Sequence, residues 1–162
     1  MVLHHLQDPV AVLRKLRKFL SRDGHIIARG SDDGSKLSSG DEGLVQKIIE
    51  LSKTGEGIAD RENGRKIYSW LDQAGYRDIK IESSMRDTSN LDADGKELLY
   101  NESFSYRIDL LNNLTFCGKD RNKENAITTI LDMQAYLLKL QELFLSHSFW
   151  YCEYDYIGIG HK

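Results

Sequence analysis

The sequence of 162 residues contains a single proline, Pro9, and only two cysteines, Cys117 and Cys152. One proline leaves long stretches free to form helices and argues against a proline-rich linker. The two cysteines are far apart and form no Cys-x-x-Cys motif, so we expect reduced thiols rather than a redox or metal-binding pair. The sequence has no repeat or low-complexity tract. A chain of this length is expected to form one domain.

The chain also lacks a basic excess and a long apolar run. It has 22 Lys and Arg against 25 Asp and Glu, a formal net charge of -3, and so no basic stripe of the kind that binds nucleic-acid phosphates. No apolar run approaches the ~18 residues of a membrane span, and the N-terminus does not have the pattern of a signal peptide. We therefore expect a cytoplasmic protein with neither nucleic acid nor a membrane as its partner.

Three segments in the first third of the chain have clear secondary-structure patterns. Asp8 suits the N-cap of a helix and Pro9 its first position, and apolar residues recur at helical spacing over 9–20. The run 25–29 is apolar in its middle and bounded by glycines, which predicts a buried strand. The spacing of apolar residues predicts a second helix over 44–51.

The rest of the chain predicts further helices and two strands. Asp60 is expected to cap a third helix that ends at Gly75, a residue type that tolerates a left-handed conformation. The alternating residues 76–82 predict a strand. Residues 94–147 have apolar positions at helical spacing and predict two helices. The aromatic and β-branched end of the chain, 149–160, predicts a last strand.

Two blocks of the sequence resemble class I methyltransferases that use S-adenosylmethionine. In the first block, Leu3-His4-His5-Leu6 is followed by Asp8-Pro9, a helix, a glycine turn and an apolar strand, which resembles the stretch after the family's fourth strand. In the second block, a helix, Ala74-Gly75-Tyr76 and a strand resemble the approach to its sixth strand. The end of the chain looks like the family's seventh, antiparallel strand.

The resemblance implies an α/β fold, the C-terminal half of a Rossmann-like class I methyltransferase sheet. Strands five, seven and six would be present with a stump of strand four, and 1–162 would form a single partial domain. Residues 90–147 would be a two-helix insertion between the last two strands. The family's glycine-rich cofactor loop would lie upstream of this segment, and no Gly-x-Gly-x-Gly follows a predicted strand here. The resemblance therefore implies weak or no binding of S-adenosylmethionine by this chain alone.

The function implied for the intact enzyme is transfer of a methyl group to a small-molecule acceptor, with this chain alone inactive. Methyl transfer is an in-line displacement that needs positioning and, for some acceptors, a base. In open α/β sheets, ligands bind beyond the carboxyl ends of the strands, so the expected catalytic residues are His5 and Asp33. The expected substrate-binding residues are His4, Arg29, Asp32, Arg61, Arg65 and Tyr106. The expected cofactor contacts are Leu3 and His4.

Other interpretations of these residues stay open. His4 and His5 could pack against or cap the sheet, and because neighbours in a strand point to opposite faces, at most one should reach the cleft. Asp32 and Asp33 could simply cap a turn. A zinc or iron site built from these four residues would indicate a metal-dependent hydrolase. Adjacent histidines are poorly spaced for one ion, so no metal is predicted.

A further alternative is a non-catalytic interaction or oligomerisation module. Without strands one to three, the sheet would leave one edge and several apolar helix faces uncovered, and such surfaces associate with other chains. We therefore expect a homodimer through this uncovered edge, with 1–20 and 25–29 at its interface. A symmetric pair is the usual closed arrangement.

Overall fold

The computed structural model describes residues 3–53, 59–109 and 123–162. In this part of the chain the protein is α/β, with an open, antiparallel, four-stranded sheet and five α-helices. The first of two compact units comprises Met1–Lys36, Ile58–Arg86 and Glu153–Lys162. The second comprises Leu37–Gly57 and Asp87–Cys152.

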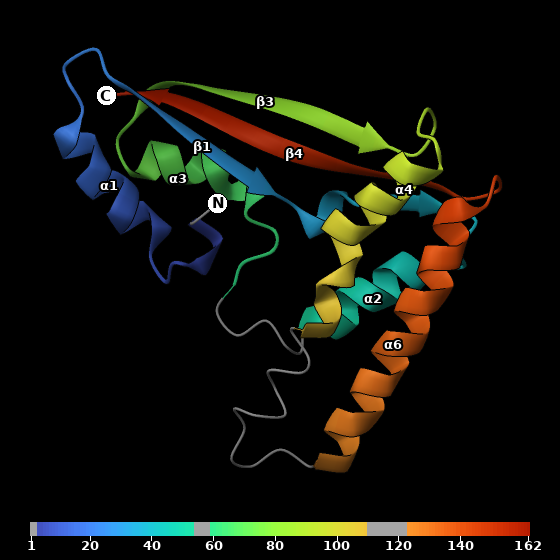
Figure 1. The fold of residues 1–162 in the computed structure, drawn as a ribbon. Coiled ribbons are helices and arrows are strands. Elements are labelled where there is room, and N and C mark those ends of the chain that lie inside the picture. Colours follow the sequence, from blue (N-terminus) through green and yellow to red (C-terminus); the bar gives the residue numbers. More distant parts are fainter. Residues whose placement is uncertain (1–2, 54–58, 110–122) are drawn as a thin grey trace. The chain divides into compact units, whose positions relative to one another are not determined.

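The last strand of the chain is the centre of the sheet (Figure 1). The strands are β1 (His25–Ser31), β2 (Leu37–Ser39), β3 (Arg77–Asp87) and β4 (Trp150–His161). β4 pairs with each of the other three, antiparallel to β1 and to β2. The predicted strands over 25–29, 76–82 and 149–160 are therefore confirmed, each with somewhat different ends.

β1 and β3 occupy opposite edges of β4. β1 pairs with β4 from His25 opposite His161 to Ser31 opposite Asp155. At the start of β3, the Arg77 guanidinium donates a hydrogen bond to the Lys162 carbonyl over 3.0 Å. Near its end, β3 is joined to β4 by the ion pair of Arg86 with Glu153. Because β3 follows the stretch of β4 that β1 also contacts, and a strand has only two edges, β4 lies between them.

The first unit packs two helices on one face of its strands, α1 (Pro9–Phe19) and α3 (Ile67–Gln73). Glycines on this face let α3 approach closely: a Cβ added to Gly158 would lie 2.2 Å from the Ile67 Cγ2 atom. Alternate residues point to the opposite face, where Ile27 is 70% exposed. The buried core of this unit is Leu13, Ala28, Ile67, Leu71, Ala74 and Tyr76.

The ends of these helices follow the sequence prediction in two of three places. The Asp8 side chain accepts a hydrogen bond from the Ala11 N–H, and Gly75, with φ of +89°, follows α3 as expected. Asp60 does not cap α3, which begins only at Ile67 after a 3-10 turn over Gly64–Lys66. The prediction placed this helix start too early, because the Asp60 carboxylate makes its hydrogen bonds within the preceding loop.

The expected stump of strand four is not a strand in the described residues. Leu3–His5 form a 3-10 turn, closed by a hydrogen bond from the Leu6 N–H to the Leu3 carbonyl. A strand needs a neighbour to satisfy its backbone groups, and β1 pairs only with β4 in the described part of the chain. The segment instead bonds within its own turn and, through the His4 carbonyl, to the Asp60 N–H.

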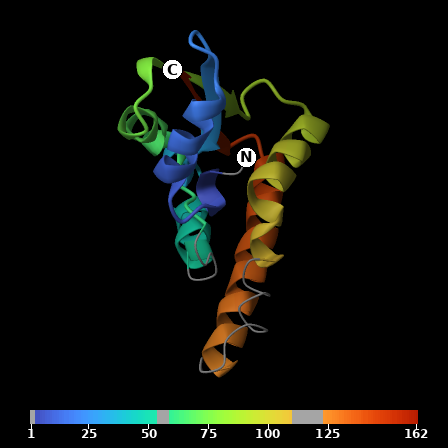
Figure 2. The ribbon, with the colours of Figure 1, turned by 90° about the vertical axis from the view of Figure 1, so that its left-hand side faces the viewer.

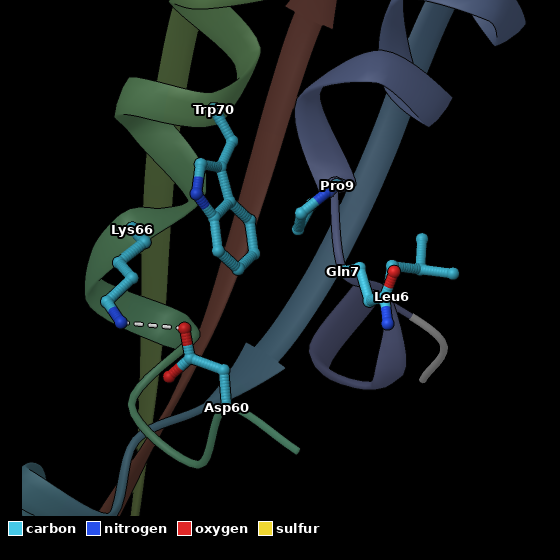
Figure 3. Close-up of a pocket in the computed structure, with 6 residues that line it drawn as sticks. All are labelled: Leu6, Gln7, Pro9, Asp60, Lys66 and Trp70. Carbon is cyan, nitrogen blue, oxygen red and sulfur yellow. Dashed lines mark hydrogen bonds and ion pairs between the residues drawn. The ribbon is translucent and has the colours of Figure 1, made fainter. Parts of the chain in front are cut away.

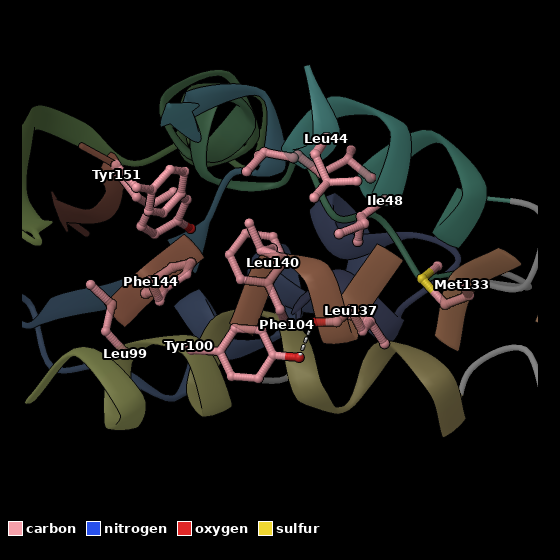
Figure 4. Packing of buried hydrophobic residues seen from close by; sticks show 13 residues of the cluster. Leu44, Ile48, Leu99, Tyr100, Phe104, Met133, Leu137, Leu140, Phe144 and Tyr151 are labelled. Carbon is pink, nitrogen blue, oxygen red and sulfur yellow. Dashed lines mark hydrogen bonds between the residues drawn. The ribbon is translucent and has the colours of Figure 1, made fainter. Parts of the chain in front are cut away.

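The second unit is built around three helices, α2 (Leu44–Lys53), α4 (Ala93–Tyr100) and α6 (Lys123–Leu145). α4 continues into a π-helical turn over Asn101–Ser105 and runs alongside α6 (Figure 2). Rings of Phe104, Phe144 and Tyr151 contact one another at centroid distances of 5.2–5.9 Å. Figure 4 shows this core, formed by Leu44, Val45, Ile48, Ile49, Leu99, Tyr100, Phe104, Met133, Leu137, Leu140, Phe144, Phe149 and Tyr151.

The predicted helices over 44–51 and 94–147 are thus found in the second unit. Cys152 is a buried thiol, as expected, whereas Cys117 lies outside the described residues. None of the described helices is both long and apolar enough to cross a membrane.

Candidate functional site

Three separate segments meet at the carboxyl end of β1, inside the first unit. The Asp33 N–H donates to the Arg61 carbonyl over 2.9 Å, and the Asp60 N–H donates to the His4 carbonyl over 2.8 Å. These backbone bonds hold the turn at 3–5, the loop after β1 and the segment before α3 together. They bring together five of the predicted site residues: His4, Asp32, Asp33, Arg61 and Arg65.

Asp32 is the most fully bonded of these residues. It is 2% exposed, and its carboxylate accepts hydrogen bonds from the Arg65 Nε at 2.6 Å and terminal nitrogen at 2.8 Å. Backbone N–H groups of Gly34 and Arg65 also donate to it. The hydrogen bond to Asp32 is the main cause that raises the pKa of Arg65. With both oxygens occupied, Asp32 caps the turn after β1, which is the structural alternative stated for it above.

A second, buried ionic cluster lies beside Asp33. The Lys36 amine pairs with Glu153 and lies 3.9 Å from the Asp33 carboxylate. Arg86 pairs with the other oxygen of Glu153. Two carboxylates therefore face two cations, and buried charges require such pairing. Lys36 and Glu153 were not among the predicted site residues, although an acidic residue inside the aromatic run of the last strand was a usable signal.

The two histidines differ in their surroundings. His4 is 8% exposed whereas His5 is exposed, and their ring centroids are 3.8 Å apart. Burial, followed by the positive charges of His5 and Arg61, lowers the pKa of His4 below its ordinary 6.5. Only one of the pair is buried, and the two side chains differ because Leu3–His5 form a 3-10 turn and not the strand for which the sequence suggested alternation. Its surroundings therefore favour the neutral form of the His4 imidazole.

A pocket of about 460 Å³ lies beside the loop that contains Asp60 (Figure 3). Leu6 and Gln7, just before α1, and Pro9, its first residue, line one side of the pocket; Asp60 and Lys66, before α3, and Trp70, within α3, line the other. The Lys66 amine donates to the Asp60 carboxylate over 2.6 Å. An aromatic wall beside a few polar groups is the usual composition of a small-molecule site. Of these six residues, none was among the predicted site residues.

The remaining predicted residues lie elsewhere. Arg29 bonds to Asp155 over 2.6 Å and its side chain is 62% exposed. Leu3, an expected cofactor contact, packs against the core of the first unit. Tyr106 belongs to the second unit, where the Arg107 guanidinium lies 5.4 Å from its ring centroid.

The alternative metal site is not assembled. In the part of the chain that the structure describes, no group of three or more His, Cys, Asp or Glu side chains is placed to hold a metal ion. His4, His5, Asp32 and Asp33 all belong to this part. The two oxygens of Asp32 bond to Arg65 instead, which takes away one ligand of the proposed set.

Comparison of the chain with known protein families and with curated protein sequences gives no match.

Proposed function

We propose that this chain forms the C-terminal half of a class I methyltransferase sheet, and that the intact enzyme transfers a methyl group from S-adenosylmethionine to a small-molecule acceptor. The observation that carries this proposal is the position of β4. The resemblance assigns β1, β3 and β4 as strands five, six and seven, in the spatial order five, seven, six. A last strand that is antiparallel and inserted between two earlier ones supports that order.

The uncovered face of the first unit gives further support. Among the described elements of the first unit, α1 and α3 lie on one face of its strands; on the other face Ile27, which is exposed, lies opposite Ile159, and Arg29 lies opposite Ile157. Rossmann-like sheets carry helices on both faces. In the proposed enzyme, helices from the N-terminal half of the domain cover this second face.

The site at the end of β1 supplies what methyl transfer requires from this half. The pocket between α1 and α3 is the proposed acceptor site, with Trp70 as its apolar wall and Asp60 and Lys66 as its polar groups. His5 is exposed and directly precedes Leu6 of the pocket wall, which makes it the candidate base for an acceptor that loses a proton. Asp33, buried near Lys36, acts as a positioning residue for the loop after β1.

The cofactor itself is held mainly by the other half in this proposal. S-adenosylmethionine would supply the methyl group as a sulfonium, and the acceptor's lone pair would displace it in line. The contribution of this chain is to bind and orient the acceptor and to take its proton. Few fixed catalytic groups are needed for such a reaction, since most of the rate comes from positioning.

The experiment uses the polypeptide encoded by the complete reading frame that contains this chain. We expect it to carry a strand followed by a glycine-rich loop, and to bind S-adenosylmethionine with a low-micromolar Kd, about 8 kcal/mol. Tritiated methyl transfer to a panel of small acceptors measures the activity. His5→Gln should lower the transfer rate by about 100-fold for a protonated acceptor.

His147→Gln is the matched control, because His147 is an exposed histidine of the second unit. It should leave both binding and transfer unchanged. A complete polypeptide that does not bind S-adenosylmethionine would refute the proposal, and equal losses in the two variants would remove the role assigned to His5.

A further inference from the structure

Two histidines lie directly opposite one another where β1 begins and β4 ends. His25 is the first residue of β1 and His161 the last of β4, and the two are partners in the antiparallel pairing. Their ring centroids are 3.8 Å apart. His25 is exposed and His161 is half-buried. His25 shares its face of the strand with Ile27, which is 70% exposed, so solvent reaches the pair.

The register of the strands brings these two side chains as close as an antiparallel sheet allows. The Lys162 N–H donates a hydrogen bond to the Gly24 carbonyl over 3.0 Å, so Gly24 and Lys162 form a hydrogen-bonded pair. Such pairs alternate along the ladder with non-hydrogen-bonded ones, and His25 with His161 is therefore a non-hydrogen-bonded pair. Side chains approach each other most closely at these positions.

The nitrogens of both rings are available to a ligand. Within the described part of the chain, neither imidazole makes a hydrogen bond or an ion pair. Two cationic side chains at this end of the sheet are bonded to main-chain carbonyls. The Lys162 amine donates to the Leu20 carbonyl over 2.6 Å, and the Arg77 guanidinium donates to the Lys162 carbonyl over 3.0 Å. Their charge opposes a bound cation, so affinity must come from the imidazole–metal bonds themselves.

A pair of imidazoles on one face of a sheet has the ligand chemistry that zinc-type ions prefer. Zn–N bonds of about 2.0–2.1 Å place two nitrogens on a tetrahedral ion roughly 3.3 Å apart. Rotation of the exposed His25 side chain between rotamers can set this spacing without moving the strands. No third His, Cys, Asp or Glu of the described residues completes the group, so water takes the other coordination positions.

From this pair we infer that His25 and His161 form a binding site for a divalent transition-metal ion of the zinc type. The bound ion joins β1 to β4 at the end of their pairing and thereby stabilises the first unit. The pair lies at the amino end of β1, whereas the site described above lies at its carboxyl end, Ser31, about 20 Å away for a strand of this length. The metal site is therefore independent of the proposed methyltransferase function.

The other close histidine pair, His4 with His5, is a poorer site for an ion. These two residues are neighbours in a 3-10 turn, and His4 is buried near the positive charge of Arg61. An ion bound there would be repelled by that charge and would reach one ring only from the exposed side. The His4–His5 pair therefore serves as the comparison within the same molecule.

NMR signals of the histidine rings test the site in the wild-type chain, prepared without an affinity tag and titrated with Zn²⁺ alone. Of the five histidines, His25 and His161 should shift together, with one ion bound per chain. We expect a Kd of about 10 μM, far weaker than that of a structural site with four protein ligands. Mg²⁺, which prefers oxygen ligands, should shift neither ring. An absence of Zn²⁺ binding up to about 1 mM, or shifts at His4 and His5 instead, would overturn the inference.

Substitution of either ligand provides the second test. His25→Gln and His161→Gln each leave a single imidazole, so calorimetry should show Zn²⁺ binding weakened by about tenfold or more. His147→Gln is the matched control, because His147 is an exposed histidine of the second unit, and it should leave the Kd unchanged. Wild-type affinity in both ligand variants, or an equal loss in the control, would show that the ion binds elsewhere and that the assignment is wrong.

Thermal unfolding measures the proposed joining of the two strands. At about a hundred times its Kd, Zn²⁺ should raise the melting temperature of the wild type by about 5 °C, and EDTA should reverse the change. The rise should disappear in His25→Gln and persist in His147→Gln. Far-UV circular dichroism verifies that each variant is folded. A rise of the same size in His25→Gln would contradict the site.

Discussion

At the scale of single residues, the end of β1 contains two kinds of ionisable group. Some are held in ion pairs, and one, His4, has a shifted pKa. Asp32, Arg65, Lys36 and Glu153 are paired, which is the condition for burying charge at low cost. His4 is different, because it is buried among positive neighbours and its pKa is lowered. A neutral imidazole at this position links the stability of the first unit to pH.

We expect acidification to destabilise the protein through His4. The unfolded chain binds a proton at His4 near pH 6.5, whereas the folded chain binds it only at a lower pH. As far as His4 is concerned, the free energy of unfolding is therefore highest above pH 6.5. It decreases as the pH falls through the lowered pKa of the folded state. The melting temperature, followed by circular dichroism between about pH 7 and pH 5, should fall more in the wild type than in His4→Gln.

His147→Gln is the control for this prediction. His147 is an exposed histidine of the second unit, so its removal should leave the pH dependence of the melting temperature in place. If His4→Gln and the wild type lose melting temperature in parallel, His4 does not carry the linkage. A direct measurement is the NMR titration of the His4 ring protons, whose midpoint should lie below 6.5.

At the scale of elements, the contact of α3 with β1 and β4 organises the first unit. The strands present glycine where the helix approaches: Gly158 lies opposite Ala28 in the pairing, and Gly30 lies opposite Tyr156. Added Cβ atoms would meet Ile67 Cγ2 at 2.2 Å and Asn63 Oδ1 at 2.0 Å, respectively. Small residues at these positions are therefore a packing requirement of the helix–sheet layer.

Gly158→Ala should destabilise the protein by about 1–3 kcal/mol, the usual cost of overpacking. The reason is the clash of the new methyl group with Ile67 Cγ2 and Leu71 Cδ1. Urea unfolding measures the change. Ile67→Leu removes the Cγ2 methyl, so the double variant should lose less than the sum of the two single changes.

Ile27→Ala is the control at the same scale, since Ile27 lies on the uncovered face of β1. It should cost less than about 1 kcal/mol. A Gly158→Ala protein as stable as the wild type would mean that α3 can move outward without penalty, and the close contact would then not be a determinant of the unit.

At the scale of the whole molecule, the proposed function makes the chain one part of a catalytic domain. In that proposal its site would provide an acceptor pocket and a candidate base, whereas no Gly-x-Gly-x-Gly follows a strand in this sequence. In this proposal, activity requires that the N-terminal half of the domain pairs with the outer edge of β1 and covers the second face of the sheet.

We expect S-adenosylmethionine to bind this chain alone with a Kd of about 1 mM or weaker, 4 kcal/mol or less. Calorimetric titration measures this, with S-adenosylhomocysteine as a second ligand that lacks the sulfonium charge. A low-micromolar Kd for either compound would contradict the assignment of the cofactor loop to another part of the enzyme.

Much of the secondary structure could be predicted from the sequence alone. The helix start at Asp8-Pro9, the glycine end at Gly75 and the alternation in the strands are local, since capping, φ preference and periodicity act over a few residues. Asp60 shows the limit of such local rules. It has the chemistry of a cap, but its carboxylate bonds to the Glu62 N–H and to Lys66 instead, and α3 begins at Ile67.

The site was predicted in part. The residues after β1 and those before α3 were placed at a strand end, which is a topological expectation. The partners that define their roles are distant in the chain: Arg65 lies 33 residues after Asp32, and Glu153 lies 117 residues after Lys36. Trp70 and Gln7 line one pocket only because α1 and α3 pack together.

By itself the sequence determined most of the helices and the strands β1, β3 and β4, because capping and periodicity depend on neighbouring residues. Only the tertiary structure decided that β4 pairs with three earlier strands and that three loops meet at the end of β1. It also decided which face of the sheet stays uncovered. Pairing between distant segments is chosen by long-range packing and hydrogen bonding, for which a single sequence contains no local signal.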